Sequence, residues 1–451
     1  MVLIIATIAF IVLTLVSPIA HGAPVSRPQT MDSVPPPGAT TNKSHGGPPH
    51  TKGRSLFANG CVMHQTDLVA ALDVVDGSKV LLCANNTIKI SSTVVIKSNT
   101  HVELVCQRAG CEITSETGFG GTLFQTTPGE KSKHRLTFKG VLFANAGNGV
   151  QSNAHLFDIT GGRTTIRAKN GQCSFDNNTF VDEIIKVEKG RMKLIGCDFT
   201  NNVGELEIVS ATASKLLFKN VVFKENKAQN NTGVADLLFF VKSNVRMRSV
   251  KFVSNEADEK IISCEDGCTL NMFKVDFTDN TAHRELFDLV LSSLVMNNCT
   301  VARNSADFAI WKTIDGSVEL SQVNFIENQA NEIMFASTTS LSMKDCAFEG
   351  NDSEEVVKLF NNVTFVGTDV TFVNNKCDNE ALSVGFFSTA ALNRTFFDDN
   401  TSRFDMLVGF GGKVTCDEET VFCDGAKSVI DAKSGSEVNG CDNSVDTRCM
   451  A

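Results

Sequence analysis

One six-residue phrase is repeated ten times between Cys173 and Asn400, and it limits what this chain can fold into. The phrase reads Val or Cys, any residue, Phe, two further residues and Asn, with Val301 in place of Phe in one copy and Thr395 in place of Val or Cys in the last. The ten Asn residues follow one another at intervals of 24, 24, 29, 25, 24, 24, 23, 24 and 25 residues. Such a fixed period is typical of a repeat architecture, in which each unit stacks on its neighbours.

The spacing of apolar residues within each repeat indicates which architecture this is. Apolar residues alternate in the phrase and in the pair that precedes it, such as Leu270 and Met272. Alternation places these side chains on one face of an extended strand, whereas a helical repeat would need an i, i+3, i+4 pattern. We therefore predict an all-β fold, a right-handed parallel β-helix of ten or more coils stacked about 4.8 Å apart. The hand follows the usual chirality of parallel crossovers.

Stacked coils place equivalent residues of the repeat above one another. We predict a column of Phe side chains inside the solenoid, formed by Phe175, Phe199, Phe223, Phe252, Phe277, Phe325, Phe348 and Phe372. The Asn lies three residues after the Phe, so both cannot point inward from one regular strand. The Asn is therefore predicted to form a bend with a left-handed backbone and with its amide stacked on the next Asn.

The two ends of the chain differ in composition from the repeats. Residues 1–22 are predicted to be a cleaved secretory signal, with an uncleaved anchor as the alternative, and residues 23–55 a disordered linker rich in Pro, Ser and Gly. The β-helix is expected over 56–410, with a short helix near Asp67–Leu72 as its N-terminal cap. Residues 411–451 are expected to form a Cys-rich C-terminal cap. We thus predict a secreted protein with no membrane span after signal removal.

A helix, a glycine and then paired strands at the start of the repeats resemble the N-terminal cap of pectin-lyase-like right-handed β-helices. The Phe-x-x-Asn repeats resemble those of the chlamydial polymorphic outer-membrane proteins and of similar secreted proteins. The resemblance covers roughly residues 56–410 and implies a β-helix at the cell exterior. The chain departs from the chlamydial pattern, because their Gly-Gly-Ala-Ile motif and the C-terminal barrel are missing.

The chain has 15 cysteines, and in a secreted chain those in caps and turns are expected to form disulfides. Local disulfides are predicted for Cys106 with Cys111 and for Cys264 with Cys268. The cysteines Cys416, Cys423, Cys441 and Cys449 are predicted to pair within the C-terminal cap, and Cys61, Cys83 and Cys377 are also expected to pair. Cys173 and Cys197 occupy the inward Val position one coil apart. The sequence allows two alternatives there, a disulfide between them or two free thiols. No metal or cofactor is predicted, because matching His ligands are missing.

Glycosylation sequons are frequent in this Asn-rich chain. The candidate acceptors are Asn85, Asn177, Asn230, Asn298, Asn362 and Asn393. Sequons at Asn351 and Asn400 coincide with the repeated Asn, where a glycan would conflict with the stacking.

The formal net charge is −10, which argues against binding to nucleic acid or to anionic membranes. Aligning the repeats shows one constellation that resembles the acid, base and cation sets of β-helix enzymes: Asp276, Asp279, Arg303 and Glu327. Such groups on neighbouring coils would serve proton transfer on an acidic polysaccharide. The alternative is an ion-pair ladder on the surface, which contributes little stability.

Two functions are therefore weighed. The first is a non-catalytic extracellular β-helix that contacts cell-wall or extracellular glycans, matrix or surface proteins. The second is a polysaccharide lyase or glycoside hydrolase. The regular repeats favour the first, because catalysis requires residues held off-pattern in a cleft.

Overall fold

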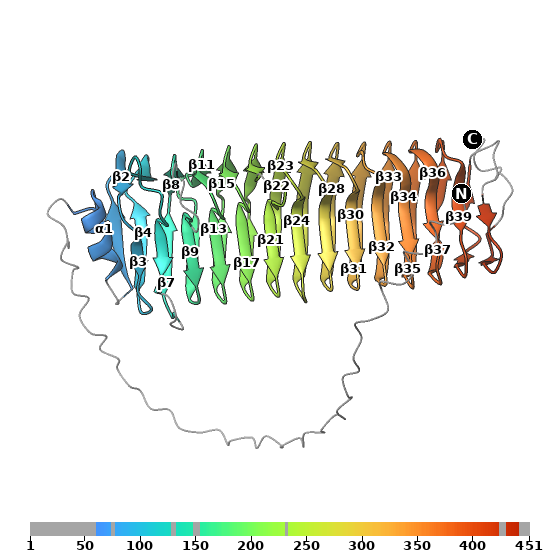
Figure 1. Ribbon diagram of the computed structural model, residues 1–451, viewed down its shortest axis with the longest axis horizontal. Helices are drawn as coiled ribbons and strands as arrows, with labels where there is room; N and C mark the ends of the chain where they lie inside the picture. Colours follow the sequence, from blue (N-terminus) through green and yellow to red (C-terminus); the bar gives the residue numbers. More distant parts are fainter. Residues whose placement is uncertain are drawn as a thin grey trace, which may run out of the picture. The chain divides into compact units, whose positions relative to one another are not determined.

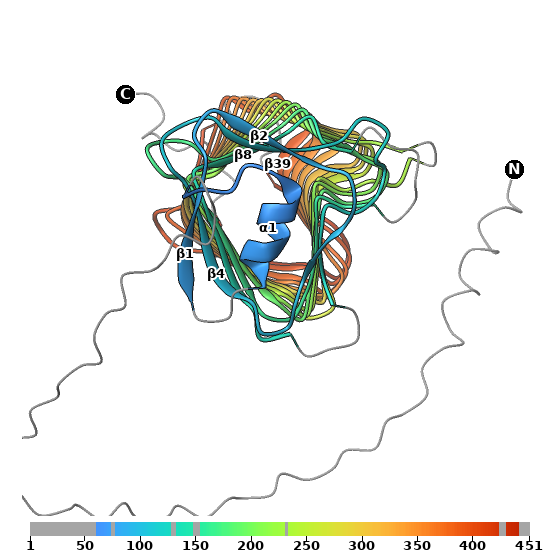
Figure 2. The ribbon, with the colours of Figure 1, turned by 90° about the vertical axis from the view of Figure 1, so that its left-hand side faces the viewer.

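The computed structural model describes residues 60–73, 77–127, 132–147, 154–230, 233–423 and 430–441. The predicted signal (1–22) and linker (23–55) lie outside the described residues. The described part is a parallel β-solenoid of about 14 coils, as the sequence predicts (Figure 1). Its one described helix, α1 (Gln65–Leu72), lies across the N-terminal opening of the solenoid (Figure 2).

Three sheets run along the solenoid. Sheet 1 has 23 strands. They are β1 (Ser78–Leu82), β2 (Asn86–Ile90), β4 (His101–Cys106), β5 (Cys111–Ser115), β7 (Arg135–Lys139), β8 (Val141–Ala144), β10 (Arg163–Arg167), β11 (Ser174–Asp176), β14 (Arg191–Ile195), β15 (Asp198–Thr200), β18 (Lys215–Lys219), β19 (Val222–Lys224), β22 (Asn244–Val253), β25 (Thr269–Thr278), β28 (Ser293–Ala302), β31 (Ser317–Ile326), β33 (Ser340–Glu349), β35 (Thr364–Val373), β37 (Thr389–Asn393), β38 (Phe396–Asp398), β40 (Lys413–Cys416), β41 (Val421–Phe422) and β43 (Glu437–Asn439).

Sheet 2 has 14 strands. Sheet 3 is a short sheet of six two-residue strands, which lie between the other two sheets in six successive coils. Sheet 2 contains β3 (Val94–Ile96), β6 (Phe124–Thr126), β9 (Phe157–Thr160), β13 (Ile185–Glu188), β17 (Val209–Thr212), β21 (Leu238–Val241), β24 (Lys260–Glu265), β27 (Glu285–Val290), β30 (Ala309–Ile314), β32 (Glu332–Ser337), β34 (Asp352–Phe360), β36 (Lys376–Val384), β39 (Phe404–Val408) and β42 (Ile430–Ala432). Sheet 3 contains β12 (Thr179–Phe180), β16 (Val203–Gly204), β20 (Lys227–Ala228), β23 (Glu256–Ala257), β26 (Thr281–Ala282) and β29 (Ser305–Ala306).

Each strand pairs in parallel with the equivalent strand of the next coil. In sheet 1, for example, Phe223 is in register with Phe252, and Phe252 with Phe277. Seen from the α1 end, the chain runs from β1 on the left through β2 at the top and winds clockwise as it recedes (Figure 2). The solenoid is therefore right-handed.

The Phe column fills the interior as the repeats predict. Its rings stack with centroid distances of 4.2 Å between Phe175 and Phe199 and 4.5 Å between Phe252 and Phe277. The column continues past residue 410, where the sequence predicts a separate cap: Phe422 stacks on Phe397 at 4.8 Å. Parallel pairing also continues to β43. The coils therefore extend into the Cys-rich segment.

The single interruption of this column is filled from the opposite sheet. Val301 replaces Phe in one coil and leaves room for larger side chains from sheet 2. Phe287 packs edge-on against Phe277 with centroids 4.6 Å apart, and Trp311 lies 6.3 Å from Phe325. The one tryptophan of the chain is thus a core residue, fully buried at the gap.

The repeated Asn also points inward, which corrects the prediction of a left-handed bend at that residue. The left-handed residue is the one before it, such as Ser254 with φ 52° before Asn255 or Asp279 with φ 56° before Asn280. This extra turn reverses the side-chain alternation, so that Phe and Asn three residues apart both face the core. All ten repeated Asn residues are buried.

Buried amides of the Asn column form a continuous hydrogen-bonded chain, as the predicted stacking requires. The Nδ2 atom of Asn255 donates to Oδ1 of Asn280 at 2.9 Å and to the carbonyl of Phe223 at 2.9 Å. Its Oδ1 accepts from the backbone N–H and the Nδ2 of Asn226. Each amide is therefore fully satisfied by the coils on either side, which removes the penalty for burying it.

Disulfides tie both ends and the middle of the solenoid. The pairs are Cys61–Cys83, Cys106–Cys111, Cys173–Cys197, Cys264–Cys268 and Cys416–Cys441. The structure thus decides for a disulfide between Cys173 and Cys197. Cys423 is also disulfide-bonded, and Cys449 lies outside the described residues.

Three described cysteines carry free thiols. Cys299 and Cys346 occupy the inward Val position, where they serve as small buried apolar residues. Cys377 is likewise free and buried, so the prediction that it pairs is wrong. Burial raises its pKa to about 12. A thiol that does not ionise is a poor partner for disulfide exchange.

The predicted glycosylation acceptors differ in exposure. Asn85, Asn177, Asn298 and Asn362 are exposed, and all four have positive φ, as corner residues of the coils. Asn230 and Asn393 are half-buried. Asn351 and Asn400 belong to the buried column, where a glycan has no room. Glycosylation of the exposed positions stays a prediction.

Candidate functional site

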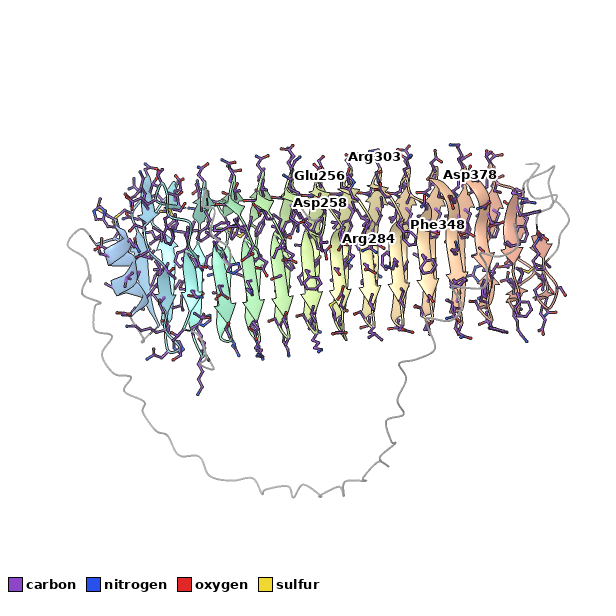
Figure 3. All side chains as sticks on the ribbon, viewed as in Figure 1. Glu256, Asp258, Arg284, Arg303, Phe348 and Asp378 are labelled. Atoms are coloured by element: carbon purple, nitrogen blue, oxygen red, sulfur yellow. A yellow bond between two sulfur atoms is a disulfide. The ribbon has the colours of Figure 1, made fainter. Side chains whose placement is uncertain are left out.

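The four residues that the aligned repeats single out lie on the outer surface. Asp279, Arg303 and Glu327 are the left-handed corner residues of three successive coils, with φ of 56°, 52° and 51°. The Arg303 guanidinium donates to Asp279 at 2.9 Å and 3.3 Å, and this bond raises the pKa of Arg303. Figure 3 shows Arg303 projecting from the upper edge of the solenoid. This half-exposed pair matches the predicted ion-pair ladder, which contributes little stability.

The fourth member of the set stands apart from the corner. Asp276 lies on β25, in register with Lys251 on one side and Thr300 on the other. Its strand position is three residues before the corner, so the four side chains do not form one cluster at the corner. The structure thus brings Asp279 and Arg303 together, and a catalytic role for the set stays a hypothesis.

A second group of charged residues was not found from the sequence, and it covers the outer face of sheet 1 in the N-terminal half. Five successive strands, β7, β10, β14, β18 and β22, present fifteen outward positions over residues 135–139, 163–167, 191–195, 215–219 and 244–248. Ten of these hold Lys or Arg, and the others hold Thr, Ile, Leu or Asn. We call the ten cations the basic groove: Arg135, Lys139, Arg163, Arg167, Arg191, Lys193, Lys215, Lys219, Arg246 and Arg248.

The surface is hollowed over these cations. One hollow of 560 Å³ is lined by Arg191, Lys215 and Arg246 among others, and a second of 510 Å³ by Arg135, Arg163 and Lys215 among others. The two hollows share Arg191 and Lys215, so they adjoin along the solenoid. Within the part of the chain that the structure describes, no Asp or Glu lines either of them.

Register places the cations of the basic groove in rows along the solenoid. Arg135, Arg163, Arg191 and Lys215 occupy the same position on four successive coils. Charges this close repel one another. Among the described residues, the ion pairs that relieve this repulsion lie at one end, where Glu103 contacts Lys139 and Arg167. Burial and the charges of Arg167, Lys79 and Lys169 lower the pKa of Lys139. The groove is therefore a site of positive potential on a chain of net charge −10.

A third group of ionisable residues forms a row beside sheet 2. In register from coil to coil are Lys260, Glu285, Ala309, Glu332, Glu355 and Glu380. On the preceding coils, Glu183, Glu207 and Asp236 each lie two residues before the aligned positions Ile185, Val209 and Leu238. We call these residues, without Ala309, the ionisable row.

The N-terminal part of the ionisable row combines carboxyls with opposite pKa shifts. Burial opposes ionisation of Glu183, but the hydrogen bond and charge of His155 and the charge of Lys186 outweigh it and lower the Glu183 pKa to about 2. On the next coil, burial and the charges of Glu183 and Asp236 raise the Glu207 pKa to about 8. At neutral pH Glu183 is therefore ionised and Glu207 mostly protonated. Such divergent pairs are a common basis for acid and base roles.

The C-terminal part of the row holds another carboxyl pair. Burial, together with the charge and the hydrogen bond of Glu355, raises the pKa of Glu380 to about 7. Lys358 bridges Glu355 and Glu332 through Nζ contacts of 2.6 Å and 3.2 Å. Burial also raises the pKa of Glu332 in spite of Lys358. Aligning sheet 2 across the coils is the sequence signal that could have found this row.

One group of described residues has the composition of a metal site. His155, Asp182 and Glu183 each bring a possible ligand atom within 4.8 Å of the others. The His155 ring already contacts the Glu183 carbonyl at 3.0 Å and the Glu183 carboxylate at 3.1 Å. Ser210 donates to the same carboxylate. The His155 ring and the Glu183 carboxylate are thus engaged with each other and with Ser210.

Among the described residues, no helix combines the length and the apolar character that a membrane crossing requires.

Comparisons with known proteins concern the architecture. No family model and no curated protein matches the sequence. Among solved structures, the chain is similar to a tailspike protein mutant of E. coli bacteriophage HK620 in complex with a pentasaccharide, at 12% identity and a TM-score of 0.42, covering 86% of this chain and 77% of that one. Another mutant of that tailspike gives a TM-score of 0.43 at 12% identity, covering 83% and 74%. The catalytic domain of Agl-KA gives 0.38 at 10% identity, covering 83% and 65%.

Proposed function

We propose that this protein is an extracellular glycan-binding solenoid whose basic groove binds an acidic polysaccharide. The observation that carries the proposal is the charge of the groove: ten cations and no carboxylate over the outward positions of five strands, in a chain of net charge −10. Such a concentration of like charge is stabilised by an anionic partner. The disulfides fit an oxidising, extracellular location.

The shape of the groove favours a linear polymer. Its cations repeat from coil to coil about 4.8 Å apart, along the long axis of the solenoid, so they can meet successive anionic groups of an extended chain. Neither hollow is lined by Phe or Trp, so the stacking platform of single-stranded nucleic-acid binders is missing there. None of the described lining residues is a carboxylate that could act as general acid or base for hydrolysis, which favours binding without cleavage in this groove.

Removing three cations of one row tests this function. In a variant carrying Arg163→Thr, Arg191→Thr and Lys215→Thr, we expect the affinity for heparin or polygalacturonate to fall about 100-fold, at about 1 kcal/mol per cation. The slope of log affinity against log salt should decrease by about 3, since each lost cation releases one counterion fewer. Thr suits exposed strand positions, so the coils should remain folded. Isothermal titration at several salt concentrations measures both quantities.

A charge-matched variant separates the groove from the overall charge. Lys89→Thr, Lys344→Thr and Lys413→Thr remove three exposed cations elsewhere, and they should leave the affinity within about threefold of wild type. Equal losses in both variants, or no binding of either polyanion by the wild type, would refute the basic groove as the site. Tighter binding of duplex DNA than of both polysaccharides would assign it to nucleic acid instead.

Glycan hydrolysis is a second candidate function, favoured by the opposite pKa shifts of Glu183 and Glu207. In this reaction a protonated Glu207 would donate its proton to the glycosidic oxygen of the leaving sugar. Ionised Glu183 would either take a proton from the attacking water or attack the anomeric carbon itself, and water would then hydrolyse the glycosyl-enzyme. Release of reducing ends from a panel of polysaccharides should then fall at least 1,000-fold in Glu207→Gln, an estimate that follows from typical acid-base contributions. As a control, Asp279→Asn, which weakens the exposed ion pair with Arg303, should retain full activity. Absence of any cleavage by the wild type would leave the binding function alone.

A further inference from the structure

Six phenylalanines form a line on the outer surface of the C-terminal half. They are Phe308, Phe335, Phe360, Phe386, Phe387 and Phe410, which we call the exposed Phe line. Five of them have exposed fractions between 36% and 61%, and Phe335 is half-buried. Only one other Phe among the described residues, Phe273, is exposed to a comparable degree. A continuous aromatic surface of this kind on a soluble protein indicates a partner.

Ring contacts connect this line from coil to coil. Phe308 and Phe335 have centroids 6.2 Å apart, Phe335 and Phe360 also 6.2 Å, and Phe360 and Phe386 4.6 Å. On the last of these coils Phe387 meets Phe410 at 5.8 Å. The rings therefore offer one aromatic face or edge per coil over five coils, instead of a single hydrophobic cluster.

Two of the rings belong to residues with an unusual backbone conformation. Phe386 and Phe387 both have positive φ, 48° and 65°. A bulky side chain rarely adopts this conformation, which the corners of the coils impose: Leu291 and Thr338 of earlier coils also have a φ of 51°. The corner before it in the solenoid uses Asn361 and Asn362, residues that tolerate a positive φ. The chain therefore places aromatic rings at a corner where a polar residue would be more stable.

Polar groups with hydrogen-bonding capacity border the rings. Glu332 lies three residues before Phe335 on β32, and its N–H donates to the carbonyl of Phe308 at 3.0 Å. Glu332 is only 5% exposed, and its Oε2 atom has no hydrogen-bond partner among the described residues. Lys358 is in register with Phe335 and contacts the other carboxylate oxygen at 3.2 Å. A buried acceptor without a donor fits a ligand that supplies a hydroxyl.

We propose that the exposed Phe line binds a neutral polysaccharide chain, whose sugar rings pack on the phenylalanines while hydroxyl groups donate to Glu332. Sugars combine apolar C–H faces with hydroxyls, which matches rings bordered by a carboxylate and a lysine. An acidic chain is disfavoured at the start of the line, where Glu332 lies beside Phe308. The aligned Glu355 and Glu380 precede Phe360 and Phe386 by five and six residues in the chain. The line crosses sheet 2 of the C-terminal half, from the residue before β30 to the corners after β36 and β39. The basic groove is on sheet 1 of the N-terminal half, so the two proposals stand independently.

Removing rings without unfolding the solenoid tests the proposal. Calorimetric titration of the whole protein with cello-, laminari- and xylo-oligosaccharides should detect binding of at least one series. Phe360→Val together with Phe386→Gly should weaken it by about tenfold or more, the effect expected for two aromatic contacts. Phe386→Gly alone should raise the urea midpoint, because glycine adopts a positive φ without strain. Gain of stability with loss of binding is the signature of a ring kept for a ligand.

Matched variants distinguish this site from the rest of the surface and from a dimer contact. Phe273→Val removes the exposed ring on sheet 1 and should leave oligosaccharide affinity unchanged, and Glu332→Gln should weaken binding while the Phe line stays intact. Heparin affinity should be the same in all these variants. The proposal is overturned if the wild type binds none of the three series, or if the double variant binds as well as the wild type. It is also overturned if the double variant instead abolishes a dimer seen by sedimentation, since the surface would then belong to a second copy.

Discussion

Replacing Asn255 by Asp is expected to lower the free energy of unfolding by about 4 kcal/mol or more at neutral pH, the largest effect we anticipate for a single substitution. A carboxylate of the same shape cannot donate to Asn280 or to the Phe223 carbonyl, as Nδ2 of Asn255 does. Each buried polar group left without a partner costs about 1–3 kcal/mol. The buried charge adds a further penalty unless the carboxyl takes up a proton.

A neighbouring substitution supplies the control. Ser254 precedes Asn255, is exposed and has a φ of 52°, a conformation that Asn adopts readily. Ser254→Asn should therefore leave stability unchanged or raise it by up to about 1 kcal/mol. Urea unfolding followed by circular dichroism measures both variants. Equal midpoints for Asn255→Asp and wild type would show that the Asn column contributes little, and the register would then rest on the Phe column alone.

The repeats made the architecture predictable because every copy carries the same physical constraint. A Phe such as Phe252 and an Asn such as Asn255 recur with one period, and only a stacked coil lets ten equal residues meet. The backbone conformation of the residues between the Phe and the Asn was harder to predict. The sequence leaves open which residue is left-handed, because Ser254, Asp279 and Arg303 occupy that corner with no common chemistry. Its left-handedness follows from closing the coil, which is a tertiary constraint.

The candidate sites were harder to predict because they arise between coils. The overall charge of −10 gives no indication of the basic groove, because the cations of the groove are spread over more than 110 residues of sequence. Only alignment of the outward positions, such as Arg163 with Arg191, shows that they gather. The same holds for Phe335 and Phe360, which sequence alone does not distinguish from the inward Phe residues. By contrast, the alignment of Asp279 with Arg303 was correct and gave a surface ion pair.

The three groups occupy different parts of one rigid scaffold. The basic groove lies on sheet 1, and the ionisable row and the exposed Phe line lie along sheet 2. Interior positions change little from coil to coil because Phe, Asn and apolar residues must stack. Outward positions are free of that constraint, and this is where charge and aromatic rings accumulate. Function in such a fold is therefore expected in the differences between coils rather than in the repeat itself.

Glu207→Gln is expected to raise the free energy of unfolding by on the order of 3 kcal/mol at alkaline pH and to leave it nearly unchanged at pH 4.5. The estimate takes about 1.4 kcal/mol per unit of pKa difference and reduces the total for partial solvent screening. The pKa of Glu207 is raised to about 8 in the folded state, chiefly by burial and then by the charges of Glu183 and Asp236. In the unfolded chain the same carboxyl has a pKa near 4.5. Between pH 4.5 and pH 8, Glu207 therefore keeps its proton in the folded state and has lost it in the unfolded state.

The sign of the pH dependence follows from this difference. Below about pH 4.5 both states are protonated and Glu207 has no effect on stability. Stability is lost as the pH rises from 4.5 to 8, because the unfolded chain ionises Glu207 while the half-buried carboxyl of the folded protein keeps its proton. Glutamine remains neutral, so the variant should lose less stability than the wild type between pH 5 and 8.5 in urea titrations. Gln in place of the exposed Glu319 should follow the wild-type curve. Parallel curves for Glu207→Gln and wild type would mean that Glu207 is ionised at neutral pH, and it would then be unable to act as the proton donor of a hydrolase.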